Sequence, residues 1–242
     1  MNFICLCAGR GTRLGAASTY LQKAMYPIGT KPFLQYSVDN LLASDAFDLY
    51  RDTVTLVVGH HSRQVVDYFG ELYPSLSVRF VTQSQQLGTG HAVSLALPED
   101  TEPLVVWLGD VYVSRDMFES VVNQPDENTV TLFREPVSSK EDYHANYRVD
   151  VDGDRVTRVW KGRSPYVEIG LWKLTHTTAE SMTRSKGDEY RALMNLDLLI
   201  QEGLGVRGIF VSDWLQIGYD VPSSSANVLR IYNELNHRGE LV

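Results

Sequence analysis

Short apolar runs alternate with amphipathic stretches through the first half of the chain. The apolar runs predict strands at residues 2–7, 53–58, 77–82 and 103–108. The stretches between them have helical periodicity and predict helices at about 33–43, 61–71 and 89–97. Continuous apolar strands separated by amphipathic helices are typical of a parallel sheet buried on both faces. We therefore expect an α/β fold with a Rossmann-like, mostly parallel sheet and helices on both faces.

The pattern changes from about residue 129 onward, where strands follow one another without intervening helices. The expected strands are 129–134, 146–151, 155–160 and 166–174. Asp152-Gly153-Asp154 predicts a turn between two of them, so we expect a small antiparallel insertion. The remaining expected elements are helices at about 176–184 and 189–202, a strand at 205–211 and a helix at about 222–237. With 242 residues, we interpret the chain as a single domain with a sizeable core.

Composition excludes several classes of function. Hydrophobic residues make up 43% and charged residues 21% of the chain, as in ordinary globular proteins. A formal net charge of −8 opposes non-specific binding to nucleic acid or to anionic membranes. No apolar run approaches the roughly 20 residues of a membrane-spanning helix, and a signal peptide has no room before the first strand. Cys5 and Cys7 share one face of that strand, which favours core thiols. We expect a cytoplasmic protein, with the oligomeric state left open, a homo-oligomer included.

The first strand runs into a glycine-rich loop that carries Gly9, Gly11 and Arg13, and Lys23 follows ten residues later. Glycine removes the Cβ obstruction, so backbone N–H groups in such a loop approach an anion closely. The spacing is not that of a P-loop. A dinucleotide-binding loop would need an acidic residue about 20 residues further on, and residues 27–32 supply none. Glycines followed by cations indicate a polyphosphate, so we interpret this segment as a nucleotide-binding loop.

Two further segments carry candidate chemistry. Residues 87–92 read Leu-Gly-Thr-Gly-His-Ala and follow the third strand, just after Gln83. A glutamine amide offers a donor and an acceptor, which suits the imide edge of a pyrimidine, and Gly88 lets a base lie against the backbone. Asp110 ends the fourth strand, and ligands of open parallel sheets bind beyond the carboxyl ends of the strands. A carboxylate there suits a hard cation.

Together these segments resemble the nucleoside-triphosphate transferase family, which includes sugar-1-phosphate nucleotidylyltransferases and small cytidylyltransferases. The L-x-A-G-x-G-T-R-L signature, the later lysine and the K-P-x-L-x-Y segment are matched here by Leu6, Ala8, Gly9, Gly11, Thr12, Arg13, Leu14, Lys23, Lys31, Pro32, Leu34 and Tyr36. Residues 87–92 match a second motif, typical of uridylyltransferases, and residues 108–110 match the Gly-Asp motif. The family usually has proline before the first lysine, where this chain has Gln22.

The resemblance implies roles for the matching residues. Arg13 would contact the leaving β- and γ-phosphates, Lys23 would bridge the phosphates near the α-position, and Asp110 would hold Mg²⁺. Residues 1–110 would form the NTP-binding half and residues 111–242 the acceptor-binding half. The expected nucleotide-binding residues are Leu6, Ala8, Gly9, Gly11, Thr12, Arg13, Lys23, Gln83, Gly88 and Thr89.

The acceptor half matches the family less well. Lys161 is retained from the family's E-K-P run and would contact the acceptor phosphate, while Arg148 and Trp160 replace a glycine and a glutamate. Glu168 is another candidate for acceptor binding. A tryptophan face at Trp160 or Trp172 would suit a quaternary ammonium.

The second metal-binding position of the family also departs from the pattern. Residues 214–218 resemble W-x-D-x-G, with Gln216 in place of the aspartate. A glutamine oxygen can ligate Mg²⁺ but carries no charge, so Asp213 or Asp220 would need to help.

The resemblance and the residues point to one reaction with open alternatives. We expect Mg²⁺-dependent transfer of a nucleotide from UTP or dTTP to a sugar 1-phosphate, with pyrophosphate released. An alternative is a cytidylyltransferase that uses CTP and a small non-sugar phosphate or phosphonate, such as a phosphocholine-like acceptor. Another alternative, suggested by Gln216, is a non-catalytic nucleotide-binding regulatory relative.

Overall fold

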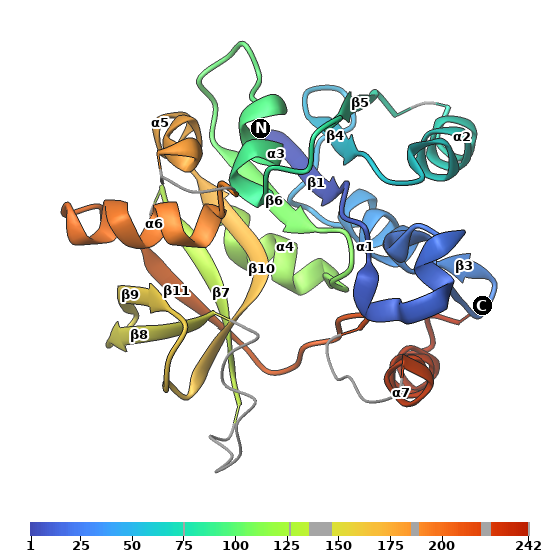
Figure 1. Ribbon diagram of the computed structural model, residues 1–242. Coiled ribbons are helices and arrows are strands. Elements are labelled where there is room, and N and C mark those ends of the chain that lie inside the picture. Colours follow the sequence, from blue (N-terminus) through green and yellow to red (C-terminus); the bar gives the residue numbers. More distant parts are fainter. Residues whose placement is uncertain (75, 126, 136–146, 185–188, 219–223, 242) are drawn as a thin grey trace.

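The computed structural model describes residues 1–74, 76–125, 127–135, 147–184, 189–218 and 224–241. A nine-stranded sheet with the order β5-β4-β1-β6-β10-β7-β11-β9-β8 forms its centre (Figure 1). The first four strands of this order are parallel and come from the first half of the chain. They are β1 (Asn2–Cys7), β4 (Thr53–Val58), β5 (Val78–Thr82) and β6 (Leu104–Leu108).

The second half of the chain continues the same sheet. Strand β10 (Tyr166–Leu174) is antiparallel to both β6 and β7 (Thr129–Arg134), and β11 (Arg207–Val211) is parallel to β7. A hairpin of β8 (Arg148–Asp152) and β9 (Arg155–Trp160) completes the sheet. The predicted α/β fold class is confirmed. The antiparallel strands extend the main sheet instead of standing apart from it, because β10 pairs directly with β6.

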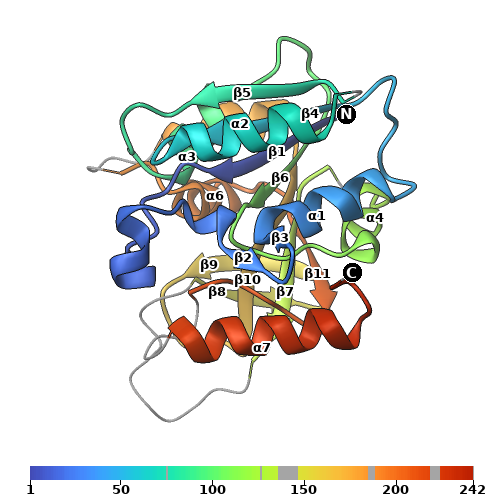
Figure 2. The same cartoon turned by 90° about the vertical axis from the view of Figure 1, so that its right-hand side faces the viewer.

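Helices cover both faces of the sheet (Figures 1 and 2). One face carries α1 (Phe33–Leu42), α2 (Ser62–Leu72) and α4 (Arg115–Val122), and the other carries α3 (Thr89–Leu95), α5 (His176–Glu180) and α6 (Ala192–Gln201). The alternation of side chains along β1 separates the two cores, since Phe3 and Cys5 face the first set of helices and Ile4 faces the second. Both cysteines are buried free thiols, as predicted.

Helix α4 was not predicted from the sequence. It is only eight residues long, which leaves little room for a periodic apolar pattern. Local signals were present, because the Ser114 hydroxyl accepts a hydrogen bond from the backbone N–H of Met117 and Asp116 lies in the first turn. The N-cap at Ser114 and the short apolar pattern of Met117, Phe118 and Val121 are the two signals in the sequence that indicate this helix.

Smaller elements surround the predicted nucleotide-binding loop. The segment that follows β1 contains two 3₁₀ helices, η1 (Thr12–Thr19) and η2 (Lys23–Met25), and a short hairpin of β2 (Pro27–Ile28) and β3 (Lys31–Pro32). Helix α7 (Ser224–His237) packs beside this region through a third apolar cluster that includes Leu14, Ile28 and Ile231 (Figure 2). Within the described residues, no helix has the length and apolar character that crossing a bilayer requires.

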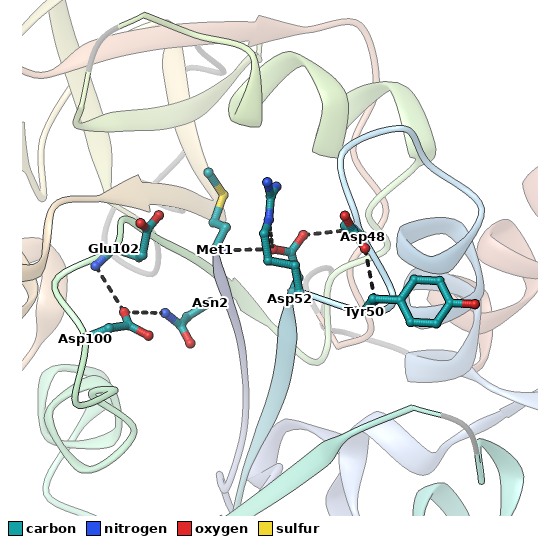
Figure 3. A network of polar contacts seen from close by, with 8 residues as sticks. Met1, Asn2, Asp48, Tyr50, Asp52, Asp100 and Glu102 are labelled. Carbon is teal, nitrogen blue, oxygen red and sulfur yellow. Dashed lines mark hydrogen bonds and ion pairs between the residues drawn. The ribbon is translucent and has the colours of Figure 1, made fainter.

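A polar network ties the start of β1 to the segment before β4 (Figure 3). The amino group of Met1 forms an ion pair of 2.7 Å with Asp52, whose side chain is 1% exposed. The second carboxylate oxygen of Asp52 accepts a hydrogen bond of 2.9 Å from the backbone N–H of Asp48. Nearby, the side chain of Asn2 donates to Asp100 at 3.0 Å. These contacts anchor two adjacent strands at their amino ends.

We predict that Asp52→Ala lowers the free energy of unfolding by about 1–3 kcal/mol, because a buried ammonium and a backbone N–H lose their acceptor. Chemical denaturation monitored by circular dichroism measures this change. Asp67→Ala on the exposed side of α2 is the matched control and should stay within about 0.5 kcal/mol of wild type. A wild-type stability for Asp52→Ala would show that the ion pair contributes nothing net.

Candidate active site

The loops that follow β1, β4 and β6 meet at the carboxyl edge of the parallel strands. They approach closely because glycines occupy the contact points. A Cβ on Gly59 would lie 2.8 Å from the carbonyl oxygen of Ala8, and one on Gly109 would lie 2.9 Å from the Cβ of Cys7. Beyond these close contacts, the loops enclose a cavity.

This first pocket has a volume of about 360 Å³. Its lining includes all ten residues that the sequence nominated for nucleotide binding, which are Leu6, Ala8, Gly9, Gly11, Thr12, Arg13, Lys23, Gln83, Gly88 and Thr89. Asp110 lines the same pocket, and Gln86 lines it as well, with its side chain donating to the Ala8 carbonyl at 2.8 Å. Segments far apart in the sequence are thus brought together around one cavity.

An ion pair between Lys23 and Asp110 crosses this pocket. Their side chains are 12% and 20% exposed, so both remain reachable from the cavity. The amide nitrogen of Gln216 donates to the same carboxylate at 3.1 Å. A backbone bridge between Val111 and Gln216 holds the two segments side by side, and the N–H of Ile217 donates to the Asp110 carbonyl at 2.9 Å.

The donor set around Asp110 fits Mg²⁺ only if a substrate supplies further oxygens. Mg²⁺ usually takes one or two protein carboxylates together with phosphates and water. Asp110 offers a carboxylate and Gln216 an amide oxygen, and the described part of the chain contains no cluster of three His, Cys, Asp or Glu side chains. Asp213 does not contribute, because it pairs with Arg238 and lines a separate cavity of about 480 Å³. Asp220 lies outside the described residues.

A second pocket of about 390 Å³ adjoins the first. Lys161, Glu168, Gln216 and Arg191 line it, together with the aromatic side chains of Tyr147 and Trp172. The residues that line both pockets are Arg13, Gly88, Thr89, Leu108 and Glu189. The geometry therefore offers two compartments that meet at Arg13.

Glu168 is the most perturbed acid of this second pocket. Burial raises its pKa from 4.5 to about 7, and hydrogen bonds of 2.5 Å from the Gly170 N–H and the Trp172 indole N–H offset only part of that effect. Gly170 adopts φ 91°, and the pairing of β10 with β7 is irregular between Glu168 and Trp172. This irregularity turns the carboxyl back onto its own strand.

Arg148 and Trp160 line neither pocket, so the cavities do not support their predicted contact with an acceptor, which stays a prediction. Arg148 forms an ion pair of 2.6 Å with Glu135 and is almost fully buried. Trp160 carries Arg158 on its ring at 4.4 Å. The ring also packs so closely on Gly162 that a Cβ there would lie 2.1 Å away. Both side chains thus make close contacts within the protein.

Comparison with known proteins agrees with these features. The sequence model described as "MobA-like NTP transferase domain" matches residues 3–147, which is more than half of the chain. The chain belongs to this family. The resemblance to nucleotidyltransferases that the motifs predicted is thereby confirmed.

Individual relatives extend the match to most of the chain. Bifunctional protein GlmU of Methanococcus maripaludis strain C5 is 28% identical over 239 residues, which cover 94% of this chain and 54% of GlmU. The chain thus spans about half the length of that relative. UTP–glucose-1-phosphate uridylyltransferase AglF of Haloferax volcanii is 26% identical over 228 residues, which cover 90% of this chain and 92% of AglF.

The fold has counterparts among solved structures. The inositol-1-phosphate CTP transferase from T. maritima superposes with a TM-score of 0.77, covering 99% of this chain and 95% of the other. At 16% sequence identity this likeness concerns the fold alone. The family fold therefore extends past the matched residues 3–147 to the second half of the sheet.

Sequence reasoning missed the part that residues 189–192 play in this family member. The backbone N–H of Gly90 donates to the Tyr190 carbonyl at 2.6 Å, and the Thr89 hydroxyl accepts from the N–H of Ala192 at 3.0 Å. A Cβ on Gly88 would lie 2.6 Å from the Tyr190 carbonyl. The glycines of the second motif thus allow this segment to dock, a requirement that no local pattern reveals.

Stability should depend on pH through Glu168. Its folded-state pKa of about 7 exceeds the ordinary 4.5, so the folded state keeps a proton that the unfolded state releases. The contribution of Glu168 to the free energy of unfolding therefore falls as pH rises from about 4.5 to 7, and it is constant outside that range. We predict that Glu168→Gln removes this dependence.

Denaturation of wild type and Glu168→Gln at pH 5 and pH 8 measures the effect. The difference between the two proteins should change by on the order of 2–3 kcal/mol in favour of the variant at pH 8. Glu71→Gln on the exposed face of α2 is the control and should show no such change. Parallel pH profiles for wild type and Glu168→Gln would contradict the assignment.

Proposed function

We propose that this protein is a Mg²⁺-dependent nucleotidyltransferase that moves a nucleotide from UTP or dTTP to a sugar 1-phosphate and releases pyrophosphate. One observation carries the proposal. Arg13, Lys23 and Asp110 converge on a glycine-lined pocket that opens into a second pocket containing Lys161 and Glu168. AglF, which matches nearly the full chain, is named for this type of reaction.

The charges of the first pocket suit this chemistry. A phosphate oxygen of the acceptor is already ionised, so attack on the α-phosphorus needs no general base. The protein must instead align two polyanions and offset their repulsion. Arg13 lies where the two pockets meet, and its planar guanidinium suits phosphate oxygens. Lys23 adds a second cation on the nucleotide side, and pairing with Asp110 keeps it pointed into the cavity.

Asp110 and Gln216 are the residues that would hold Mg²⁺. Bound there together with phosphate oxygens, the ion would neutralise negative charge on the triphosphate. The non-catalytic alternative rested on the missing charge at Gln216. Against that alternative, Arg13, Lys23 and Asp110 still line one pocket, and the amide nitrogen of Gln216 donates to Asp110 and so keeps this side chain at the remaining carboxylate.

Gln83 supports uracil or thymine as the base. Its amide nitrogen donates to the Gly88 carbonyl at 3.0 Å and to Nδ1 of His91 at 3.1 Å, which uses both amide hydrogens. Among the residues that the structure describes, Oε1 has no partner, so it would accept from a ligand. With Oε1 facing position 3 of the base, uracil and thymine present an N3–H donor to it, whereas N3 of cytosine is an acceptor. Cytosine would have to shift to offer its 4-amino group instead.

The second pocket supports a phosphorylated acceptor with hydroxyl groups. Lys161 supplies a cation for its phosphate, and Glu168 supplies a carboxyl that can accept or donate a hydrogen bond near pH 7. The alternative with CTP and a phosphocholine-like acceptor relied on a tryptophan face at Trp160 or Trp172. Trp160 does not line the pocket, and Trp172 lines it but is only 2% exposed and donates its indole N–H to Glu168, so the sugar phosphate is favoured.

Arg13→Ala and Lys23→Ala should each reduce turnover by at least about 100-fold, the effect of removing one preorganised charge from a transition state. Pyrophosphate release from UTP or dTTP, screened against a panel of sugar 1-phosphates, is the assay. Lys31→Ala is the matched control for Lys23, because Lys31 also pairs with an aspartate but lies outside both pockets. An inactive wild type across the whole panel would refute the proposed reaction.

We further predict that kcat/KM for UTP exceeds that for CTP by about 10- to 100-fold, since CTP would oppose two acceptors at Gln83. Gln83→Ala should raise the KM for UTP and reduce this preference. Gln85→Ala, an exposed glutamine in the same loop, should change neither quantity. Equal use of UTP and CTP by wild type would overturn the role of Gln83.

A further inference from the structure

The residue before Lys23 is held by a side chain from another element. Gln64, on the first turns of α2, accepts a hydrogen bond of 2.8 Å from the backbone N–H of Gln22. The amide nitrogen of Gln64 also donates to the Tyr20 carbonyl at 2.7 Å. A single side chain therefore secures the chain at two points, immediately before η2 begins.

Gln22 itself is 2% exposed, and its polar groups are engaged by the protein. Its side-chain nitrogen donates to the Cys7 carbonyl, and its side-chain oxygen accepts from the backbone N–H of Ala24. With the bond to Gln64, these contacts fix residue 22 against the end of β1 and against η2. The backbone adopts φ −68°, a value within the range that proline allows.

Lys23 follows directly and has little freedom of its own. A Cβ on Gly11 would lie 3.0 Å from the Cβ of Lys23, so the loop lies against the lysine stem. The ammonium group reaches Asp110 across the pocket. Both ends of the Lys23 side chain are therefore confined. Because residue 22 holds the backbone from which this side chain starts, a shift of residue 22 would move the ammonium group.

The same corner between β4 and α2 holds the loop at a third point. Nε2 of His60 and Nε2 of His61 lie 2.9 Å and 3.3 Å from the carbonyl oxygen of Ser18. Among the described residues, His61 is the one non-glycine residue with positive φ, at 53°. Positive φ is uncommon outside glycine, although histidine adopts it more often than most residues, and here the contact with Ser18 holds the ring in place.

We propose that Gln64, acting through Gln22, is a positioning residue that fixes the ammonium of Lys23 on the phosphates of the nucleotide. The inference rests on the proposed function, since it concerns the geometry of that transfer. Gln64 lines neither pocket, so it would act through Gln22 and not by contact with substrate. It acts by preventing residue 22, and with it Lys23, from moving out of line.

The test compares Gln64→Leu with wild type in kinetics and in hydrogen exchange. We expect kcat to fall by about 10- to 100-fold with little change in KM, because small displacements of a catalytic charge cost this much in the transition state. Hydrogen exchange followed by mass spectrometry should be faster in peptides that cover residues 18–25 than in wild type. Gln201→Leu is the matched control, since Gln201 also lies on a helix and donates to a loop carbonyl, that of Thr157 at 3.0 Å.

A second background separates positioning from general stability. Gln22→Pro is compatible with the φ of residue 22 but removes the backbone N–H that donates to Gln64. It also removes the side-chain hydrogen bonds of Gln22 with Cys7 and Ala24. In this background, Gln64→Leu should change kcat by less than about twofold. An equal loss of kcat in both backgrounds would overturn the proposal.

An active wild type with an equally active Gln64→Leu would also overturn it, whereas an inactive wild type would refute the proposed function instead. Unchanged exchange at residues 18–25 in Gln64→Leu would overturn the proposal independently of any activity, even if Gln22→Pro fails to fold.

Discussion

The parallel pairing of β1 with β4 and β6 is the constraint on which the site depends. The register sets Cys7 opposite Val58 and Leu6 opposite Leu108, so the three strands end together. Their loops must then share one edge of the sheet, where the backbone groups of each loop are exposed to the same ligand. Strand pairing thus determines where the site lies, whatever side chains the loops carry.

The antiparallel continuation of the sheet adds the second compartment. Because β10 lies against β6, the strand that bears Glu168 lies next to the strand that ends at Leu108, two residues before Asp110. The irregular pairing within β10 interrupts its alternation at that point. A feature of sheet geometry therefore explains how one strand serves the apolar core and a polar pocket together.

Local sequence patterns predict much of the sheet and of the first pocket. Strands β1 and β4 and the predicted nucleotide-binding residues follow from apolar runs and glycine spacing, which act over a few residues. Arg148 and Trp160 could not be placed in this way. Their partners, Glu135 and Gly162, are selected by how hairpin β8–β9 packs, which depends on residues distant in the sequence. A motif match locates a residue along a strand but does not say which neighbours occupy its side chain.

Gln22 is another residue whose partners could not be predicted from a motif. The sequence shows it only as a departure from the proline usual in the family that the motifs resemble. The structure shows a buried amide with partners on β1, η2 and α2. Rigidity that one residue type supplies covalently is supplied here by hydrogen bonds, whose partners only the folded chain reveals.

The docking of Met182 and of residues 189–192 on the second motif has a consequence for how the chain can be divided. A Cβ on Gly90 would lie 2.0 Å from the Met182 carbonyl, so the two segments are in direct contact. A fragment that ends after Asp110 would lose this contact and would also leave the edge of β6 unpaired. Exposed apolar strand edges promote aggregation. The predicted division after residue 110 would therefore be a poor place to cut the gene for expression.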